Sequence, residues 1–175
     1  MILAIDPGNI VSGYCLMDEN YKPVMFGKED NNFILSKIDI LADTYDPWGL
    51  FQEKHSMLHP KAAVIEMVAS YGMPVGQTVF DTCVWIGRFT QQLENNGIPV
   101  YYVKRKEYVV EFCGSSRAND ANVRQYLIDR FAPNTANYGK GTKKEPGWFK
   151  GFSKDVWQAY AIGTYFLDKE KENDR

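Results

Sequence analysis

Three acidic residues stand where the sequence predicts rigid elements to end or begin. Asp6 follows four apolar residues and precedes a Pro-Gly pair, so we expect it at the end of a short buried strand. Glu66 has a similar place in a second apolar run, Ala62–Val68, and Asp155 lies in the first turn of a predicted helix near the end of the chain. A carboxylate beside an apolar core is costly unless it is paired or holds a cation. We therefore expect Asp6 to be the first ligand of a divalent-metal site.

The chemistry that fits these acids is metal-assisted hydrolysis of a phosphodiester. Carboxylates near the ends of two buried strands repel each other, and burial raises the penalty, whereas a metal ion relieves both effects. Two divalent ions about 3.5–4 Å apart activate a water and stabilise the leaving oxygen, and Mg²⁺ needs only a few carboxylates on rigid elements. Two simpler interpretations stay open. Asp6 could turn the chain before Pro-Gly, and Asp155 could be a favourable charge at a helix N-terminus.

The rest of the chain predicts the elements that position these acids. Residues 1–28 hold three apolar segments separated by turns, which is typical of an antiparallel three-stranded meander. After the first strand, we expect strands at Val11–Asp18, Lys22–Lys28, Ala62–Val68 and Ile98–Val103, and helices at Asn31–Thr44, Trp48–Leu58, Gln77–Asn96, Asp120–Phe131 and Ser153–Lys169. Lys104–Phe112 fits a short helix or a loop, and Pro133–Gly151 fits a long mobile loop. The fold class is therefore α/β, with a five-stranded mixed sheet of three antiparallel strands and then two parallel ones, flanked by helices.

Two of these helices carry apolar stripes that we expect to face the core. The stripe of the first comprises Val79, Cys83, Ile86, Phe89 and Leu93. That of the closing helix comprises Val156, Ala159, Tyr160, Gly163 and Phe166. Gly163 is its weak point, because a glycine inside a helix costs about 1 kcal/mol relative to alanine.

Length and composition indicate one globular domain. The 175 residues predict a single domain over residues 1–170 with a frayed tail over 171–175, and they contain no apolar stretch of transmembrane length and no signal peptide. Three cysteines without a C-x-x-C pair favour a reducing, cytoplasmic location. From Tyr101 to Lys154 there are eleven Lys and Arg against five Asp and Glu, while the remainder has nine against seventeen. Such asymmetry indicates a face that meets a polyanion, although chance clustering on a solvated surface is the simpler alternative.

An ordered set of motifs resembles the RuvC-type Holliday junction resolvases, in particular the compact version carried by phages of low-GC Gram-positive hosts. The motifs are I-D-P-G at Ile5–Gly8 with S-G-Y at Ser12–Tyr14, V-I-E-M-V at Val64–Val68, R-A-N-D-A-N-V-R at Arg117–Arg124, and the stretch Gly141–Ile162. The resemblance implies a ribonuclease H-like fold and a homodimer joined by the long helix after Glu66. It also implies a phage enzyme that acts in the bacterial host cytoplasm and cuts branched DNA. Asp6, Glu66 and Asp155 would bind Mg²⁺ or Mn²⁺ as catalytic ligands.

One position departs from the family pattern. The family usually has a fourth acid one helical turn after the third, and here that place holds Gln158. An amide can still ligate a metal or form hydrogen bonds, but it brings no charge. Either three acids suffice, or Gln158 or Asp120 completes the ligand set. Asp120 has a competing interpretation as a helix N-cap.

The DNA side of the site is expected to be basic. Lys143, Lys144, Lys150 and Lys154 crowd the loop and helix start next to Asp155, where they would neutralise phosphates. Arg117 and Arg124 would extend this track. Tyr71, in the loop after Glu66, would stack on an exposed base, or else simply pack in its loop.

Other functions fit the sequence less well. A ribonuclease H-like nuclease acting on flaps, forks or hybrids has the same acids, and a non-catalytic junction-binding protein is compatible with Gln158. An actin-like ATPase would need a second phosphate loop and about twice the length. His55 and His59 have the spacing of a helical zinc pair but lack the glutamate that the zincin motif requires, so we interpret them as a solvated helix face.

Overall fold

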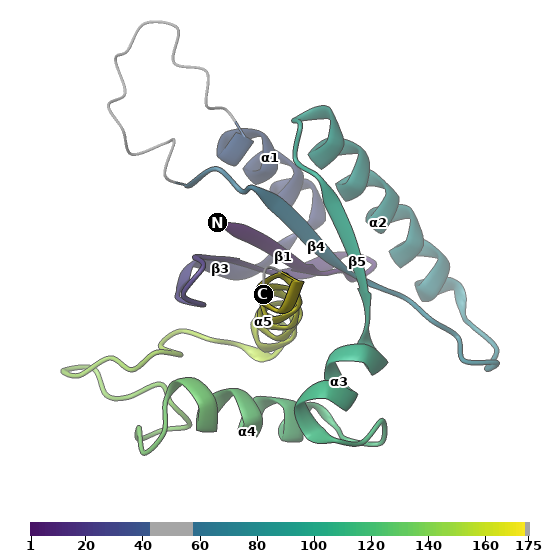
Figure 1. The fold of residues 1–175 in the computed structure, drawn as a ribbon. Helices are drawn as coiled ribbons and strands as arrows, with labels where there is room; N and C mark the ends of the chain where they lie inside the picture. The colour runs from purple at the N-terminus through teal and green to yellow at the C-terminus, as the bar shows by residue number, and fades with distance from the viewer. Residues whose placement is uncertain (43–57, 174–175) are drawn as a thin grey trace, which may run out of the picture.

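The computed structural model describes residues 1–42 and 58–173, which form a five-stranded mixed sheet with helices on both faces (Figure 1). The strand order is β3-β2-β1-β4-β5. The strands are β1 (Ile2–Asp6), β2 (Val11–Met17), β3 (Pro23–Asp30), β4 (Ala62–Met67) and β5 (Val100–Lys104), and the helices are α1 (Asn31–Ala42), α2 (Gln77–Asn95), α3 (Arg105–Cys113), α4 (Asp120–Phe131) and α5 (Lys154–Asn173). The predicted helix Trp48–Leu58 lies almost wholly outside the described residues.

The sheet has the predicted composition of three antiparallel strands followed by two parallel ones. β1 pairs with β2 and β2 with β3 in antiparallel register, whereas β4 pairs parallel to β1 and β5 parallel to β4. The β2–β3 turn is closed by Asp18, whose carboxylate accepts hydrogen bonds from the backbone N–H groups of Asn20 and Lys22. This part of the fold prediction is confirmed.

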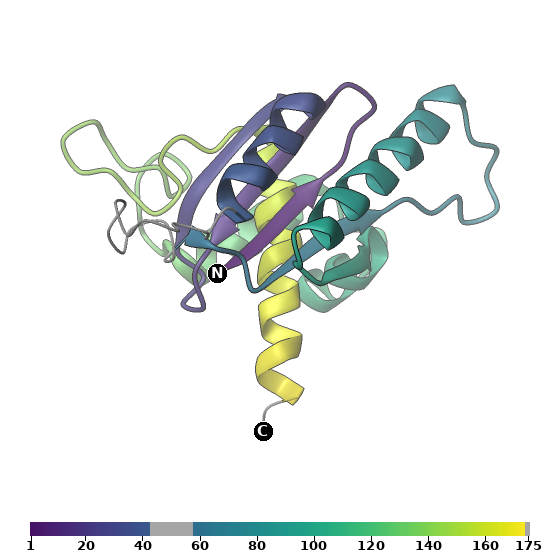
Figure 2. The same ribbon diagram turned by 90° about the horizontal axis from the view of Figure 1, so that it is seen from above.

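Alternation along the strands divides the core between the two faces of the sheet. Leu3 and Ile5 of β1 face the layer formed by α1 and α2, while Ile2 and Ala4 face α5. Figure 2 shows α1 and α2 side by side over one face, with α5 crossing the other. Helices α3 and α4 pack outside α5, so α5 is buried on nearly all sides.

The packing of α5 against the sheet explains why residue 163 is a glycine. A β-carbon at this position would stand 2.4 Å from Cε of Met17 and 3.1 Å from Cβ of Ala4. The helix therefore lies unusually close to β1 and β2 at this point. The expected cost of a mid-helix glycine is offset by this close packing.

The segment between α4 and α5 is irregular, as predicted, but it is packed onto the domain rather than free of it. Phe149 and Phe152 are fully buried and contact the aromatic rings of Trp157 and Tyr160. The backbone N–H of Phe149 donates to the carbonyl of Gly139, and that of Gly147 donates to Lys140. The description of this segment as a mobile loop is therefore corrected.

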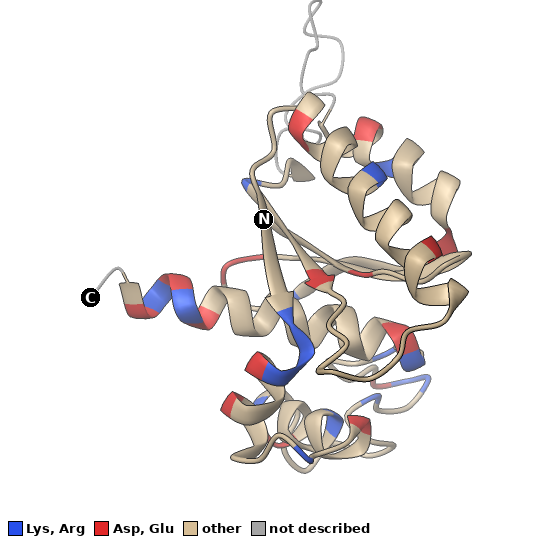
Figure 3. Cartoon of the chain, turned by 90° about the vertical axis from the view of Figure 1, so that its right-hand side faces the viewer, with Lys and Arg blue, Asp and Glu red and all other residues tan. Residues whose placement is uncertain are grey.

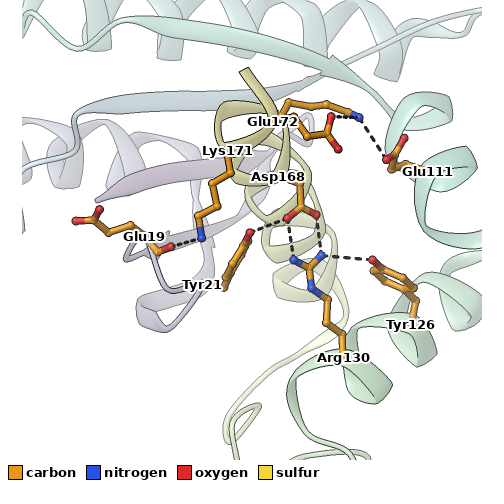
Figure 4. Close-up of polar contacts among 9 residues, drawn as sticks. Glu19, Tyr21, Glu111, Tyr126, Arg130, Asp168, Lys171 and Glu172 are labelled. Carbon is orange, nitrogen blue, oxygen red and sulfur yellow. Dashed lines mark hydrogen bonds and ion pairs between the residues drawn. The ribbon is translucent and has the colours of Figure 1, made fainter. Parts of the chain in front are cut away.

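A polar cluster joins α4, α5 and the β2–β3 turn (Figure 4). Arg130 donates two hydrogen bonds to Asp168, of 2.7 and 2.8 Å, and the hydroxyl of Tyr21 donates a third of 2.7 Å. Lys171 donates to the carbonyl of Glu19 and lies 4.0 Å from the centre of the Tyr21 ring. These contacts attach the C-terminal half of α5 to the turn.

Several predicted boundaries and burial assignments were wrong. Helix α5 ends at Asn173 instead of Lys169, so residues 171–173 of the predicted frayed tail are helical. On α2, Cys83 is exposed and Thr82 is buried in its place, because the buried stripe follows steps of three and four residues through Ile86. Within the described part of the chain, every helix is too short or too polar to cross a bilayer.

Candidate active site

Asp6 and Glu66 lie next to each other at the carboxyl ends of two parallel strands. The register pairs Ile5 with Ile65, so the following residues are neighbours across β1 and β4. Both acids share strand parity with Ala4 and Val64, which face α5. The two carboxylates therefore point to the same side of the sheet.

Asp155 lies in the first turn of α5, the helix that packs on the face of the sheet shared by Asp6 and Glu66. Gly13 of β2 pairs with Asp6, and a β-carbon on Gly13 would stand 2.5 Å from the carbonyl oxygen of Asp155 and 3.0 Å from its Cβ. Only a glycine leaves room for the first turn of the helix at this place. The fold thus brings the three acids predicted from the sequence to one end of one face of the sheet.

The turn after Asp6 is fixed by a buried hydrogen-bond network. The backbone N–H of Gly8 donates to Ser12 Oγ at 3.0 Å, and Ser12 donates to Asn31 Oδ1 at 2.6 Å. Asn31 Nδ2 returns a bond to the Gly8 carbonyl at 2.9 Å. Asn31 is the first residue of α1 but does not cap it, because the carboxylate of Asp30 caps that helix by accepting from Asn32 N–H. Asn31 instead attaches the helix start to the turn beside Asp6.

Burial disfavours the ionised forms of Asp6 and Glu66. Burial, followed by the charges of Glu66 and Asp155, holds the pKa of Asp6 well above its usual value. Among the described residues, none forms a hydrogen bond or ion pair with the Asp6 carboxylate. Burial also raises the pKa of Glu66, although a hydrogen bond from Tyr108 and the charge of Arg105 act in the opposite direction. The charge of Arg105 offsets part of this repulsion at Asp6, but no cation among the described residues forms an ion pair with that carboxylate.

A second set of side chains surrounds Glu66 from α3. The buried hydroxyl of Tyr108 donates to Glu66 Oε2 at 3.0 Å and lies 3.2 Å from Gln158 Oε1. Arg105 donates to Gln158 Oε1 at 3.3 Å and to the Tyr108 hydroxyl at 3.0 Å, and it forms an ion pair with Asp120. The roles of Tyr108 and Arg105 are not predictable from the sequence, where only their place in the basic segment distinguishes them.

Gln158 and Asp120, the two suggested fourth ligands, are both engaged by Arg105. Gln158 is buried beside Glu66, while Asp120 is exposed at the first position of α4. The side chain of Asn119, not that of Asp120, caps this helix by accepting from the N–H groups of Ala121 and Asn122. The interpretation of Asp120 as the N-cap is therefore wrong.

Asp155 also has a cationic partner that the sequence did not predict. Lys28 Nζ lies 2.5 Å from Asp155 Oδ2. Across the described part of the chain, no three Asp, Glu, His or Cys side chains converge closely enough to hold one metal ion as they stand. The donor set is nevertheless of the kind that a hard cation binds, because all three side chains supply carboxylate oxygens at one end of one face of the sheet and no described residue pairs with Asp6. A cation shared by all three acids would compete with Lys28 for the carboxylate of Asp155.

The predicted DNA contacts fall into two groups. Lys154 and Arg124, together with the half-buried Lys140, line a hollow of about 400 Å³ that also contains Asp120 and Gln158. The other predicted basic residues, Lys143, Lys144, Lys150 and Arg117, are exposed away from this hollow. Figure 3 shows basic segments in α3, in α4 and in the loop that leads to α5.

Tyr71 lies beside a second hollow of about 360 Å³, lined by Arg105, Lys106, Val109, Ser116 and Ala118. Tyr71 is 57% exposed, and the ammonium of Lys106 lies 5.8 Å from the centre of its ring. The ring is therefore available for stacking and is not packed into its loop.

The arrangement of this sheet and α5 matches solved junction resolvases. Thermus thermophilus RuvC has a TM-score of 0.61 at 11% identity, and the match covers 98% of this chain and 96% of that one. The fold is RuvC-like. The same RuvC, in complex with Holliday junction substrate, has a TM-score of 0.62 at 13% identity, covering 98% and 95% of the two chains. Fowlpox virus resolvase in complex with Holliday junction DNA has a TM-score of 0.56 at 13% identity, covering 97% and 99%.

These likenesses confirm the predicted ribonuclease H-like fold class. The RuvC-like sheet and helices extend over nearly the whole chain. No protein-family model matches the sequence, and no curated protein matches it either. At identities of 11–13%, the likeness concerns the fold, and the roles of individual residues rest on the geometry of the site.

Proposed function

We propose that this protein is a divalent-metal-dependent endonuclease that cuts four-way DNA junctions. The observation that carries the proposal is the gathering of Asp6, Glu66 and Asp155 at one edge of a RuvC-like sheet. Their mutual repulsion destabilises the protein alone, so stability does not explain the arrangement. The solved RuvC and fowlpox proteins that share the fold were each determined with Holliday junction DNA.

Asp6, Glu66 and Asp155 would hold Mg²⁺ or Mn²⁺. The bound ion supplies charge stabilisation at the scissile phosphate and a water of lowered pKa. Tyr108 fixes one oxygen of Glu66, and because burial raises the pKa of Tyr108, its hydroxyl stays protonated and keeps donating. Hydrolysis joins the water oxygen to phosphorus, breaks one P–O bond of the DNA backbone and leaves a protonated hydroxyl on the released strand.

Three acids suffice in this proposal. The carbonyl oxygen of Gln158 accepts from Arg105 and lies beside the Tyr108 hydroxyl, and Asp120 is bound to the same guanidinium. Both side chains would therefore orient Arg105 and Tyr108 rather than ligate the ion. Glu66 and Arg105 are then held in fixed positions next to the DNA.

The basic residues would bind the DNA backbone at two distances from the site. Lys154 and Arg124 line the hollow beside Gln158 and would contact phosphates close to the cut. Lys143 and Lys144 would contact phosphates farther along the strand, with Lys150 and Arg117 extending that surface. Tyr71 would stack on a base exposed at the branch point.

Paired cuts need two sites related by symmetry, which a twofold dimer supplies. On α2, Phe80 is 56% exposed and Val84 is 62% exposed. Exposed apolar residues on one helix favour burial against a second copy. We propose that α2 forms a homodimer interface.

A panel of end-labelled substrates tests the proposal. A four-way junction, a flap, a fork and an RNA–DNA hybrid are each incubated with EDTA, Mg²⁺ or Mn²⁺. Symmetric paired nicks on the junction, dependent on metal, are expected. Cleavage of only the flap, fork or hybrid indicates a ribonuclease H-like nuclease of different substrate. Tight junction binding without cleavage under any metal indicates a binding protein.

A further inference from the structure

Lys28 is aligned with Asp6 across the strands of the sheet. The register pairs Asp6 with Gly13 on β1 and β2, and Gly13 with Lys28 on β2 and β3. Directly paired residues point to the same face of an antiparallel sheet. Phe26, two residues before Lys28, packs in the core on the α5 side. Lys28 therefore stands on one side of Gly13 and Asp6 on the other, and both face α5.

Asp155 lies above Gly13, between these two residues. Its backbone is so close that a β-carbon on Gly13 would clash with it, and its carboxylate forms the 2.5 Å ion pair with Lys28. The side chain of Lys28 is 45% exposed, while that of Asp155 is 24% exposed. The ammonium is thus open to solvent on one side and bound to a proposed metal ligand on the other.

The pair differs from an ordinary surface salt bridge in its neighbours. An isolated exposed pair contributes about 0–1 kcal/mol and has no further consequence. Here the carboxylate of Asp155 also repels Asp6, whose pKa it raises. Asp155 therefore has two competing partners, the lysine in the metal-free protein and the cation in the metal-bound protein.

We infer that Lys28 is a phosphate-binding residue that Asp155 holds in place until a divalent cation takes the carboxylate. The inference rests on the proposed function and deepens it. A divalent ion attracts the carboxylate more strongly than an ammonium does, so binding of the ion releases Lys28. The freed ammonium remains at the same sheet edge, where it neutralises charge on a backbone phosphate of the DNA. Lys28 then supplies a positive charge only when the site is loaded.

Binding of Mn²⁺ alone, measured by isothermal titration calorimetry, tests the first half of this inference. Lys28→Met removes the competing ammonium, so Mn²⁺ is expected to bind about 2- to 5-fold more tightly, in keeping with the strength of a single exposed ion pair. Lys61→Met is the matched control, because Lys61 is 57% exposed, pairs with Glu170 at 3.3 Å and lies at the opposite end of the sheet. Its affinity for Mn²⁺ should equal that of the wild type.

Junction cleavage at saturating Mn²⁺ tests the second half. Lys28→Met should cut roughly 10-fold or more slowly under single turnover, as expected for a lost phosphate contact that stabilises developing charge. Lys28→Arg retains the charge and should recover most of the rate. Thus one substitution is expected to strengthen metal binding and weaken catalysis together, which a merely structural effect does not produce.

Three results overturn the inference. Weaker Mn²⁺ binding by Lys28→Met would mean that the lysine only positions Asp155. Wild-type affinity for Mn²⁺ in Lys28→Met would mean that the lysine and the metal do not compete. An unchanged cleavage rate in this variant would mean that Lys28 makes no contact with the phosphate. Failure of the proposed function looks different, because it requires that the wild-type protein itself binds no Mn²⁺ or cuts no junction, and that result overturns the inference as well.

Discussion

Gly13 lies beneath Asp155, with room for no side chain between β2 and the first turn of α5. A β-carbon at position 13 would stand 2.5 Å from the Asp155 carbonyl oxygen. Because Gly13 pairs with Asp6 on β1, this contact sets how closely the third acid approaches the first. The separation of the acids therefore depends on the absence of one methyl group.

Gly13→Ala is expected to lift the start of α5 and to lower both stability and activity. Overpacking of this kind costs about 1–3 kcal/mol. Thermal unfolding measures the stability, and Mn²⁺ titration measures the metal affinity, which should fall if the acids are moved apart. Gly163→Ala is the matched control, since it obstructs the same helix against Met17 and Ala4, about two helical turns along α5 from Asp155. Equal loss of Mn²⁺ affinity in both variants would contradict a specific role for Gly13.

The sequence predicted the elements and the three acids better than the contacts between them. Asp6 and Glu66 could be found because apolar runs that end in an acid are visible locally. Lys28 could not, since its place beside Asp155 depends on the register of two hairpins and on the path of α5. Phe149 falls in the predicted mobile loop because its burial comes from the aromatic rings of Trp157 and Tyr160, not from local periodicity.

Asp6→Asn is expected to abolish cleavage and leave junction binding within about twofold, because the carboxylate would hold the metal rather than the DNA. In EDTA the variant should also be more stable, since the neutral amide escapes repulsion from Glu66 and Asp155. A gain of about 1 kcal/mol raises Tm by about 2–4 °C in a domain of this size. Asp81→Asn, at a half-buried acid of α2 that accepts from Gln77, is the control. A lower Tm for Asp6→Asn would show that the carboxylate is stabilised in the metal-free protein.

Two pairs of lysines should separate DNA binding from catalysis. Alanine at both Lys143 and Lys144 should weaken junction binding and reduce the slope of log K against log salt by about 1.8, or 0.9 for each lost phosphate contact. Alanine at both Lys140 and Lys154 should reduce the slope similarly and also slow cleavage of the bound junction, because these residues line the hollow beside Gln158. An unchanged salt slope for the Lys143 and Lys144 pair would exclude the exposed loop as a phosphate contact.

Asp168 should make stability depend on pH in the acidic range. Burial acts to raise its pKa, but the hydrogen bonds from Arg130 and Tyr21 outweigh this and hold the pKa below its usual value. Because the folded-state pKa is lowered, the contribution is present at neutral pH and is lost as pH falls below about 4. Asp168→Asn should cost about 1.5–3 kcal/mol at pH 7, the usual range for hydrogen bonds to a charged group.

The comparison of unfolding curves from pH 7 to pH 2 checks this. The difference between wild type and Asp168→Asn should shrink toward zero at the acidic end. Asp129→Asn, where the carboxylate is exposed and accepts from Gln125, is the control and should change little at any pH. A difference that is independent of pH would mean that the charge of Asp168 is not what stabilises the cluster.

The central claim is that Asp6, Glu66 and Asp155 share a divalent cation beside the DNA. Anomalous diffraction at the manganese edge, from crystals of the wild-type protein grown with Mn²⁺, tests this most directly. The expected result is a manganese peak in contact with the carboxylates of Asp6, Glu66 and Asp155, with Lys28 released from Asp155. A protein that cuts junctions with Mn²⁺ while its manganese peak lies elsewhere, away from Asp6, would contradict the claim.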